Sequence, residues 1–150
     1  MILPAFFTSA SPAETFDLGK SIVPLLEEGS IVALRGPLGA GKTCFVKGIA
    51  EGLCIKEEVT SPTYTIVSEY GGTLSGLRPV VLYHIDAYRL RGDDDFTGIG
   101  GEEIIFGKGI SVIEWSERIP GFITPGAFRV DIEINEGEKR RIRIYRGSEK

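Results

Sequence analysis

The stretch RGPLGAGKTCF, residues 35–45, decides the fold class of this chain. Within it, residues 36–43 match the pattern G-x-x-x-x-G-K-[ST], which is typical of a glycine-rich loop that wraps phosphate groups. The apolar run SIVAL at residues 30–34 predicts a buried strand before the loop, and a helix is expected from near Gly41 to near Gly52. Because this strand, loop and helix order is the context that the motif requires, we predict nucleotide binding.

The residues of this loop have the properties that phosphate binding requires. Gly36, Gly39 and Gly41 let the backbone approach an anion without side chains in the way. Loop N–H groups and the N-terminus of the following helix would point at the β- and γ-phosphates. Lys42 would bridge oxygens of these phosphates, and the hydroxyl of Thr43 would bind Mg²⁺.

Other segments predict a mixed α/β architecture. The sequence Ser11-Pro12-Ala13-Glu14 has the form of a capping box, and a helix is expected from there toward Glu28, kinked or shortened at Pro24. Further elements are expected as strands in residues 59–70, 79–86, 110–115, 128–134 and 141–145, a turn at residues 71–72, and a short helix within residues 93–105. The last two strands alternate apolar and polar residues, which is typical of a hairpin with one solvent-facing side.

These patterns together indicate the arrangement of the sheet. Continuous apolar strands joined through helices predict a parallel centre, with antiparallel strands at the edge. At 150 residues the chain is long enough for one hydrophobic core. We therefore expect a single P-loop NTPase-like domain over residues 1–150, with three layers, a mainly parallel central sheet, flanking helices and a C-terminal antiparallel hairpin.

The composition is that of a globular protein, with 42% hydrophobic and 25% charged residues. A net charge of −4 does not favour nucleic-acid binding over the whole surface. No apolar run approaches membrane-spanning length and the start lacks a basic leader, so neither membrane insertion nor secretion is expected. Cys44 and Cys54 fit a reducing cytoplasm, and the lack of a C-x-x-C pair argues against structural zinc. Cys44 is interpreted as a small core residue.

A phosphate-loop protein also needs a carboxylate near its metal ion, commonly at the end of a buried strand. Two acids meet this condition, because Asp86 ends the run VVLYHID and Glu114 ends the run SVIE. Either acid is a candidate metal ligand, and the other is then a candidate for positioning the attacking water. Composition does not rank them.

The identity of the base is indicated by a missing motif. Guanine-specific GTPases normally carry Asn-Lys-x-Asp, in which the Asp reads the guanine edge. The only asparagine of this chain, Asn135, is followed by Glu136 and Gly137. ATP is therefore favoured over GTP.

Several further residues permit more than one interpretation. Ser61-Pro62-Thr63 is either an ordinary loop or a switch segment in which Thr63 senses the γ-phosphate. His84, the single histidine, lies on an apolar strand and is interpreted as a packed, hydrogen-bonded residue rather than a base. Trp115 belongs either to the core or to a cover over part of the site. A solvated strand face is favoured over RNA contact for the basic set Lys139, Arg140, Arg141, Arg143 and Arg146.

Four blocks in this order, GPLGAGKT, SPTYTIVSEY, YHIDAYRL and VIEW, resemble the bacterial TsaE family, also called YjeE, over nearly the whole chain. The segment at residues 14–19 also fits the opening helix of that family. The resemblance implies a small P-loop ATPase, weak alone, that acts in the synthesis of threonylcarbamoyladenosine in tRNA. It also implies a partner complex of the TsaB and TsaD type, which makes the carbamoyl transfer and through which contact with tRNA is indirect.

The resemblance assigns roles to individual residues. Glu114 matches the Mg²⁺ ligand beside Thr43, and Asp86 matches the acid that orients water near the γ-phosphate. Asp86, Lys42 and Glu114 are thus the expected catalytic residues, and Thr63 matches a switch-like loop. The expected ATP-binding residues are Thr15, Leu38, Gly39, Ala40, Gly41, Lys42, Thr43 and Cys44. Two departures from the family pattern are Cys44, where Thr or another small residue is common, and the glycine-rich segment GIGGEEII at residues 98–105.

Two other functions share the phosphate loop. A small-molecule kinase needs an acceptor pocket and usually an arginine-bearing lid, for which Arg89 and Arg91 are the nearest candidates. A nucleotide-gated binding module would hydrolyse little ATP, and its function would not depend on Asp86 or Glu114. The three functions differ in what becomes of the γ-phosphate, which goes to water, to a small molecule or nowhere.

Overall fold

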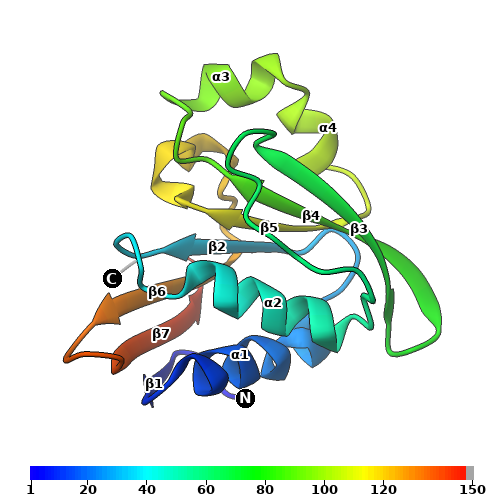
Figure 1. Ribbon diagram of the computed structural model, residues 1–150. Helices are drawn as coiled ribbons and strands as arrows, with labels where there is room; N and C mark the ends of the chain where they lie inside the picture. The colour runs from blue at the N-terminus through cyan, green and yellow to red at the C-terminus, as the bar shows by residue number, and fades with distance from the viewer. Residues whose placement is uncertain (148–150) are drawn as a thin grey trace.

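A seven-stranded sheet runs through the protein in the order β1-β7-β6-β2-β5-β4-β3. The computed structural model describes residues 1–147, and Figure 1 shows helices on both faces of the sheet. The strands are β1 (Ala5–Ser9), β2 (Ile31–Arg35), β3 (Val67–Leu74), β4 (Arg78–Asp86), β5 (Ile110–Glu114), β6 (Phe128–Ile134) and β7 (Arg140–Arg146). The neighbours β6, β2, β5 and β4 run parallel, and the remaining pairs are antiparallel. The predicted α/β class, with its parallel centre and C-terminal hairpin, is confirmed.

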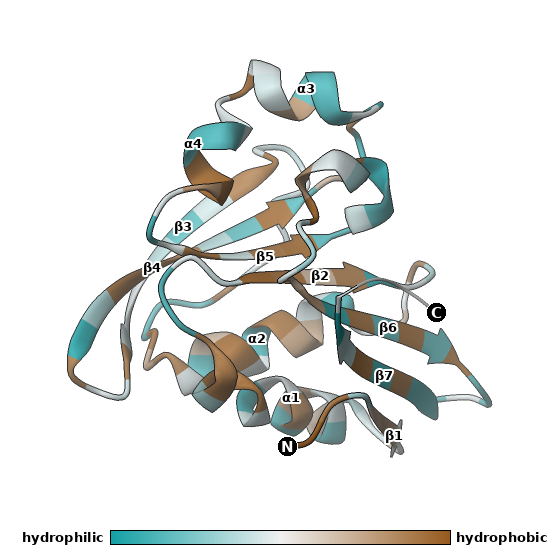
Figure 2. Ribbon diagram, turned by 180° about the vertical axis from the view of Figure 1, so that it is seen from behind, coloured by the Kyte–Doolittle hydropathy of each residue, from teal (hydrophilic) through white to brown (hydrophobic). Residues whose placement is uncertain are grey.

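Each face of the sheet has its own helices and its own hydrophobic core. Helices α1 (Pro12–Ser21) and α2 (Lys42–Gly52) lie on one side, and the short helices α3 (Asp93–Gly98) and α4 (Gly101–Ile105) lie on the other (Figure 1). Figure 2 shows that β2 and β5 are mostly apolar, although each ends in a charged residue, whereas β6 and β7 alternate. This difference arises because the central strands are covered on both faces. Within the described residues, no helix has the length and apolar character needed to cross a membrane.

Two glycines allow α1 and α2 to pack at very short distance. A Cβ atom on Gly19 would overlap the backbone carbonyl of Phe45, and one on Gly48 would overlap that of Phe16. This packing also brings Thr15 of α1 close to Gly41, where a Cβ would lie 3.6 Å from Thr15 Cγ2. The helix pair therefore places α1 against the phosphate loop.

Gly48→Ala is expected to lower the free energy of unfolding by about 2 kcal/mol, because the added methyl must displace the backbone of α1. The same change in an unconstrained helix would raise stability by about 1 kcal/mol. Urea unfolding followed by circular dichroism measures the difference. Gly98→Ala in α3 is the matched control, since its Cβ would meet nothing within 4 Å. A Gly48→Ala variant as stable as the wild type would contradict the close packing.

The first helix has the predicted start and an early end. The Ser11 hydroxyl accepts the N–H of Glu14 at 3.2 Å, as the capping box predicts. The Glu14 carboxylate accepts from Ala10 N–H at 2.9 Å, one residue before the expected donor. Helix α1 stops at Ser21 and a separate 3-10 turn covers Val23–Leu25, so Pro24 shortens the helix rather than kinking it.

The expected turn at residues 71–72 is wrong. Gly71 and Gly72 both lie inside β3, and the chain turns at residues 75–77 instead. A Cβ on Gly72 would lie 2.5 Å from the carbonyl oxygen of Leu53, so this glycine permits a close backbone approach and not a turn. The strand expected from residue 59 begins only at Val67, and the residues before it form a loop at the candidate site.

Positive φ angles set two other boundaries that differ from expectation. Trp115 has φ 58°, so β5 ends at Glu114 rather than at the tryptophan. Gly100 has φ 85° and separates α3 from α4, so the single short helix expected within residues 93–105 is two helices. The strand break matters for the site, because it leaves the Glu114 side chain at the last position of a buried strand.

Candidate functional site

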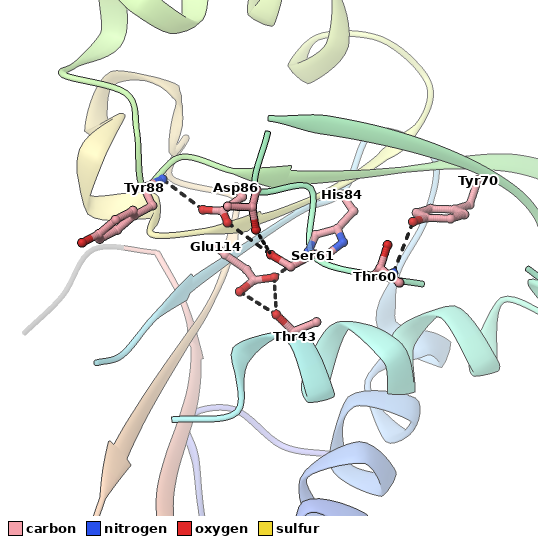
Figure 3. A network of polar contacts seen from close by, with 9 residues as sticks. Thr43, Thr60, Ser61, Tyr70, His84, Asp86, Tyr88 and Glu114 are labelled. Atoms are coloured by element: carbon pink, nitrogen blue, oxygen red, sulfur yellow. Dashed lines mark hydrogen bonds and ion pairs between the residues drawn. The ribbon is translucent and has the colours of Figure 1, made fainter. Parts of the chain in front are cut away.

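The carboxyl ends of β2, β5 and β4 meet at one edge of the sheet. In the strand register, Glu114 of β5 lies opposite Leu34 of β2 on one side and Asp86 of β4 on the other. The loop at residues 36–41 leaves β2 at this edge and leads directly into α2. The edge thus brings the phosphate-loop motif together with both candidate acids, as is general for sites in open parallel sheets (Figure 3).

Glu114 joins the phosphate-loop helix to strand β4. The Thr43 hydroxyl lies 3.1 and 3.0 Å from the two carboxylate oxygens of Glu114, and His84 Nε2 lies 2.6 Å from one of them (Figure 3). Glu114 is 4% exposed and His84 is fully buried. Because a carboxylate only accepts hydrogen bonds, Nε2 donates, and the ring orients the acid. His84 is packed and hydrogen-bonded as predicted, but its partner could not be foreseen from its apolar neighbours.

The oxygen atoms of Thr43 and Glu114 suit a small, hard cation. Among residues 1–147, no group of three or more Asp, Glu, His or Cys side chains could hold a metal ion by itself. Mg²⁺ does not require such a group, since it commonly binds one or two protein oxygens and takes its remaining ligands from phosphates and water. The donor set therefore fits Mg²⁺ held together with a phosphate ligand.

The Lys42 side chain bonds to the backbone of the phosphate loop that precedes it. Its ammonium donates to the carbonyls of Gly36 at 2.6 Å and Pro37 at 3.0 Å, and it lies 4.1 Å from the centroid of the Trp115 ring. Burial lowers the pKa of Lys42, while the nearby carboxylates of Glu114, Glu117 and Asp86 oppose that shift. The cation is thus held by dipoles and a ring face inside the loop. Both interpretations of Trp115 apply, because its ring lies over the Lys42 ammonium and also packs against the core on the side of α3 and α4.

Asp86 binds the loop that precedes β3. One of its carboxylate oxygens accepts from Tyr88 N–H at 3.0 Å, and the other lies 3.3 Å from the Ser61 hydroxyl. The Thr63 hydroxyl in turn lies 3.4 Å from that of Ser61. The structure therefore brings Thr63 to Asp86 only through Ser61, and both hydroxyl residues are exposed. The loop is also bonded to Asp86 through the backbone, since the Asp86 N–H donates to the carbonyl of Ile66 at 2.8 Å.

A small cavity of about 140 Å³ lies on the other side of the phosphate loop. Its walls come from α1, the loop, α2 and the β6–β7 hairpin: Pro12, Thr15, Gly39, Ala40, Gly41, Cys44, Glu138 and Arg140. Thr15 is 2% exposed, with its hydroxyl 2.7 Å from that of Ser9. Cys44 is half-buried rather than part of the core, and burial raises the pKa of its thiol. The predicted residues Thr15 and Cys44 therefore do lie beside the loop.

The side chains of Leu38 and Arg140 take opposite directions at the loop, one into solvent and one toward the loop backbone. Leu38 is 84% exposed, so any contact it makes with phosphate comes from its backbone. The basic set was interpreted as a solvated face, and this holds for the exposed residues Lys139, Arg141 and Arg146, whereas Arg140 and Arg143 are half-buried. The Arg140 side chain turns to the phosphate loop and donates to the carbonyl of Ala40 at 3.1 Å. The alternating pattern missed this contact because the partner lies 100 residues away in the chain.

Comparisons with known proteins point to one family. The protein-family model described as threonylcarbamoyl adenosine biosynthesis protein TsaE matches residues 9–143. The tRNA threonylcarbamoyladenosine biosynthesis protein TsaE of Treponema pallidum is 43% identical over 91% of this chain and 96% of its own length. The Aquifex aeolicus protein of the same name is 41% identical over 91% and 92%.

A solved structure is similar over an even larger share of the chain. The crystal structure of Bacillus subtilis YdiB superposes with a TM-score of 0.78, at 30% identity, over 98% of this chain and 88% of that protein. The family-model match, over residues 9–143, includes the phosphate loop and the strands that carry Asp86 and Glu114. The chain belongs to the TsaE family of threonylcarbamoyl adenosine biosynthesis proteins.

Proposed function

We propose that this protein binds and hydrolyses Mg·ATP in the cytoplasm, in support of threonylcarbamoyl modification of adenosine in tRNA, together with a TsaB/TsaD-type complex. Membership of the TsaE family supports the pathway. One observation carries the nucleotide part of the proposal. It is the contact of Thr43 with the buried Glu114 carboxylate, 3.0 Å away, at the end of a phosphate-loop motif.

On binding the triphosphate, Lys42 would exchange its hydrogen bonds to loop carbonyls for hydrogen bonds to phosphate oxygens. In the structure the Lys42 ammonium is bonded to the Gly36 and Pro37 carbonyls. Phosphate oxygens are stronger acceptors for a cation than these carbonyls, so Lys42 would turn to the β- and γ-phosphates. The loop N–H groups and the N-terminus of α2 would hold the same anion. Magnesium held by Thr43 and Glu114 would supply charge neutralisation at the β- and γ-oxygens.

Hydrolysis would then need a positioned water molecule. Asp86 lies at the end of β4, next to Glu114 in the register, with one carboxylate oxygen bonded only to the exposed Ser61 hydroxyl among the described contacts. We assign Asp86 to accept a hydrogen bond from water and aim it at the γ-phosphorus. Attack forms the new P–O bond as the bond to ADP breaks, and the products are ADP, phosphate and a proton. Lys42 and the loop amides stabilise the charge that develops.

The arrangement of Arg89 and Arg91 argues against a small-molecule kinase. These arginines are the candidates for a lid over the phosphates. Arg89 lies over the ring of Tyr64, 4.8 Å from its centroid, and Arg91 pairs with Asp95 on the start of α3 at 3.3 Å. Neither contact directs a guanidinium to the phosphate loop, so the structure offers no observation that favours kinase chemistry.

Reconstitution with the partner complex tests the proposed function. The purified protein is mixed with a TsaB/TsaD-type complex, Mg·ATP and tRNA, and both inorganic phosphate and modified adenosine are measured. We expect co-elution that depends on ATP, and hydrolysis stimulated on the order of tenfold or more, because a partner can complete a nucleotide site. A phosphorylated small molecule in place of inorganic phosphate would overturn ATP hydrolysis. Full tRNA modification without ATP cleavage would favour the nucleotide-gated binding module.

A further inference from the structure

Arg140 connects the C-terminal hairpin to the phosphate loop through all three nitrogen atoms of its guanidinium group. On the loop, Nε donates to the carbonyl of Ala40 at 3.1 Å and Nη2 to that of Gly39 at 3.2 Å. On the hairpin, Nη1 donates to the carbonyls of Gly137 at 2.6 Å and Lys139 at 3.0 Å. A planar fork that reaches four carbonyls fixes the loop and the hairpin turn relative to each other.

The bonds to the loop carbonyls also fix loop N–H groups. In a planar trans peptide, the C=O of one residue and the N–H of the next point in opposite directions. Arg140 holds the carbonyls of Gly39 and Ala40 on the outer side of the loop, which turns the N–H groups of Ala40 and Gly41 to the inner side. Orientation by the protein is needed here, because Gly39 and Gly41 have φ angles of 80° and 105° and are the least restricted residues of the loop.

The inner side of the loop is already arranged around one oxygen atom. The Ala40 N–H donates to the carbonyl of Pro37 at 3.0 Å, and the Lys42 ammonium donates to the same carbonyl at 3.0 Å. These donors come from different residues and converge on a single acceptor. A phosphate oxygen that replaced this carbonyl would meet both donors, provided that the Ala40 peptide keeps its orientation.

We propose that Arg140 is a positioning residue of the nucleotide site, which orients the Ala40 and Gly41 amides toward phosphate by holding the carbonyls behind them. The inference rests on the proposed function, since it concerns how ATP is held. It assigns the β6–β7 hairpin, at the far end of the chain from the loop, to the binding of the polyphosphate. Arg140 touches the loop from behind and does not act on the γ-phosphate itself.

The test compares two neighbouring arginines. Arg140→Ala and Arg140→Lys are measured against Arg141→Ala and Arg141→Lys, because Arg141 is the next residue on β7 and is exposed. Affinities for ADP and for inorganic tripolyphosphate are determined by competition with a fluorescent ADP. We expect Arg140→Ala to weaken both ligands by about tenfold or more, as for lost charge-assisted bonds. Arg140→Lys keeps the charge but loses the planar guanidinium, so its affinities should lie between those of the wild type and Arg140→Ala. The Arg141 variants should bind both ligands like the wild type.

Tripolyphosphate has no nucleoside, so its affinity reports whether Arg140 acts on phosphate binding or on a contact with the nucleoside. If Arg140→Ala weakens ADP but not tripolyphosphate, Arg140 acts on the nucleoside and the proposal is overturned. A second measurement, the amide resonances of Ala40 and Gly41 without nucleotide, guards against an effect of misfolding. These resonances should shift in Arg140→Lys and not in Arg141→Lys while the rest of the spectrum is kept, and unchanged resonances would overturn the proposal. If the wild type binds ADP and the Arg140 variants bind it equally well, this inference alone fails, whereas a wild type that binds no nucleotide overturns the proposed function as well.

Discussion

Lys42→Ala is expected to weaken ATP binding by about a hundredfold or more, because it removes two or more charge-assisted hydrogen bonds to phosphate. The fold should survive, since among residues 1–147 the Lys42 ammonium contacts only two loop carbonyls and the ring face of Trp115. Isothermal titration calorimetry measures the affinity. In the wild type, the fluorescence of Trp115, the only tryptophan, gives a second signal of binding, because the Lys42 ammonium lies 4.1 Å from its ring and would leave it on binding. This change in fluorescence should be absent in Lys42→Ala.

The same helix provides a matched control for this variant. Lys47 of α2 is exposed and lies one and a half turns further along the helix, so Lys47→Ala removes the same charge away from the loop. It should bind ATP like the wild type. Unchanged ATP affinity in Lys42→Ala would refute the assignment of the loop as the nucleotide site, and with it the proposed ATPase.

Glu114→Gln is expected to lower Mg·ATP hydrolysis by about a hundredfold, measured with the partner complex present. The neutral amide keeps the size of the side chain and loses the charge that a divalent cation requires. The Mg²⁺ concentration that gives half-maximal hydrolysis should rise at the same time. His84→Gln should move both quantities in the same direction by a smaller factor, because His84 only orients the carboxylate, from 2.6 Å away.

Asp86→Asn distinguishes the roles of the two acids. If Asp86 positions water, this variant should also hydrolyse ATP slowly, but its Mg²⁺ dependence should match that of the wild type. Glu102→Gln on α4 is the control, since Glu102 is an exposed acid on the helix layer away from the loop. An unchanged Mg²⁺ requirement in Glu114→Gln, or a raised one in Asp86→Asn, would reverse the assignment. Full activity in both variants would show that neither acid is catalytic.

The local elements around the phosphate loop follow from the sequence because their signals lie within a few residues of each other. A continuous apolar run, three glycines and a Lys-Thr pair predict β2, the loop and α2, and the structure has them at Ile31–Arg35 and Lys42–Gly52. The capping residue Ser11 and the breaker Pro24 bound α1 for the same reason. The alternation of β6 and β7 predicts their hairpin, since both strands face one core with every second side chain.

Sequence patterns fail where the position or role of a residue depends on a partner far away in the chain. Strand β1 is short and its pairing with β7 joins the two ends of the chain, so no local pattern reveals it. A glycine pair is typical of a turn, but Gly72 lies in a strand. A glycine is needed there because the backbone of Leu53 comes too close for a side chain. The acids Asp86 and Glu114 are equivalent as strand-end residues, so no local pattern ranks them. The family resemblance matched Glu114 to Thr43, and in the structure α2 places the Thr43 hydroxyl on Glu114.

By itself, then, the sequence determined that this chain carries a phosphate-binding loop between a buried strand and a helix, in an α/β sheet with a parallel centre. The local pattern left open which acid faces Thr43; the family resemblance assigned Glu114, and the structure shows that contact. The tertiary structure alone decided that His84 orients Glu114 and that Arg140 reaches back to the loop across 100 residues of chain. The physical reason is the range of the interactions. Hydrophobic periodicity and glycine spacing act over a few residues, whereas hydrogen bonds between strand ends depend on the order and register of the whole sheet.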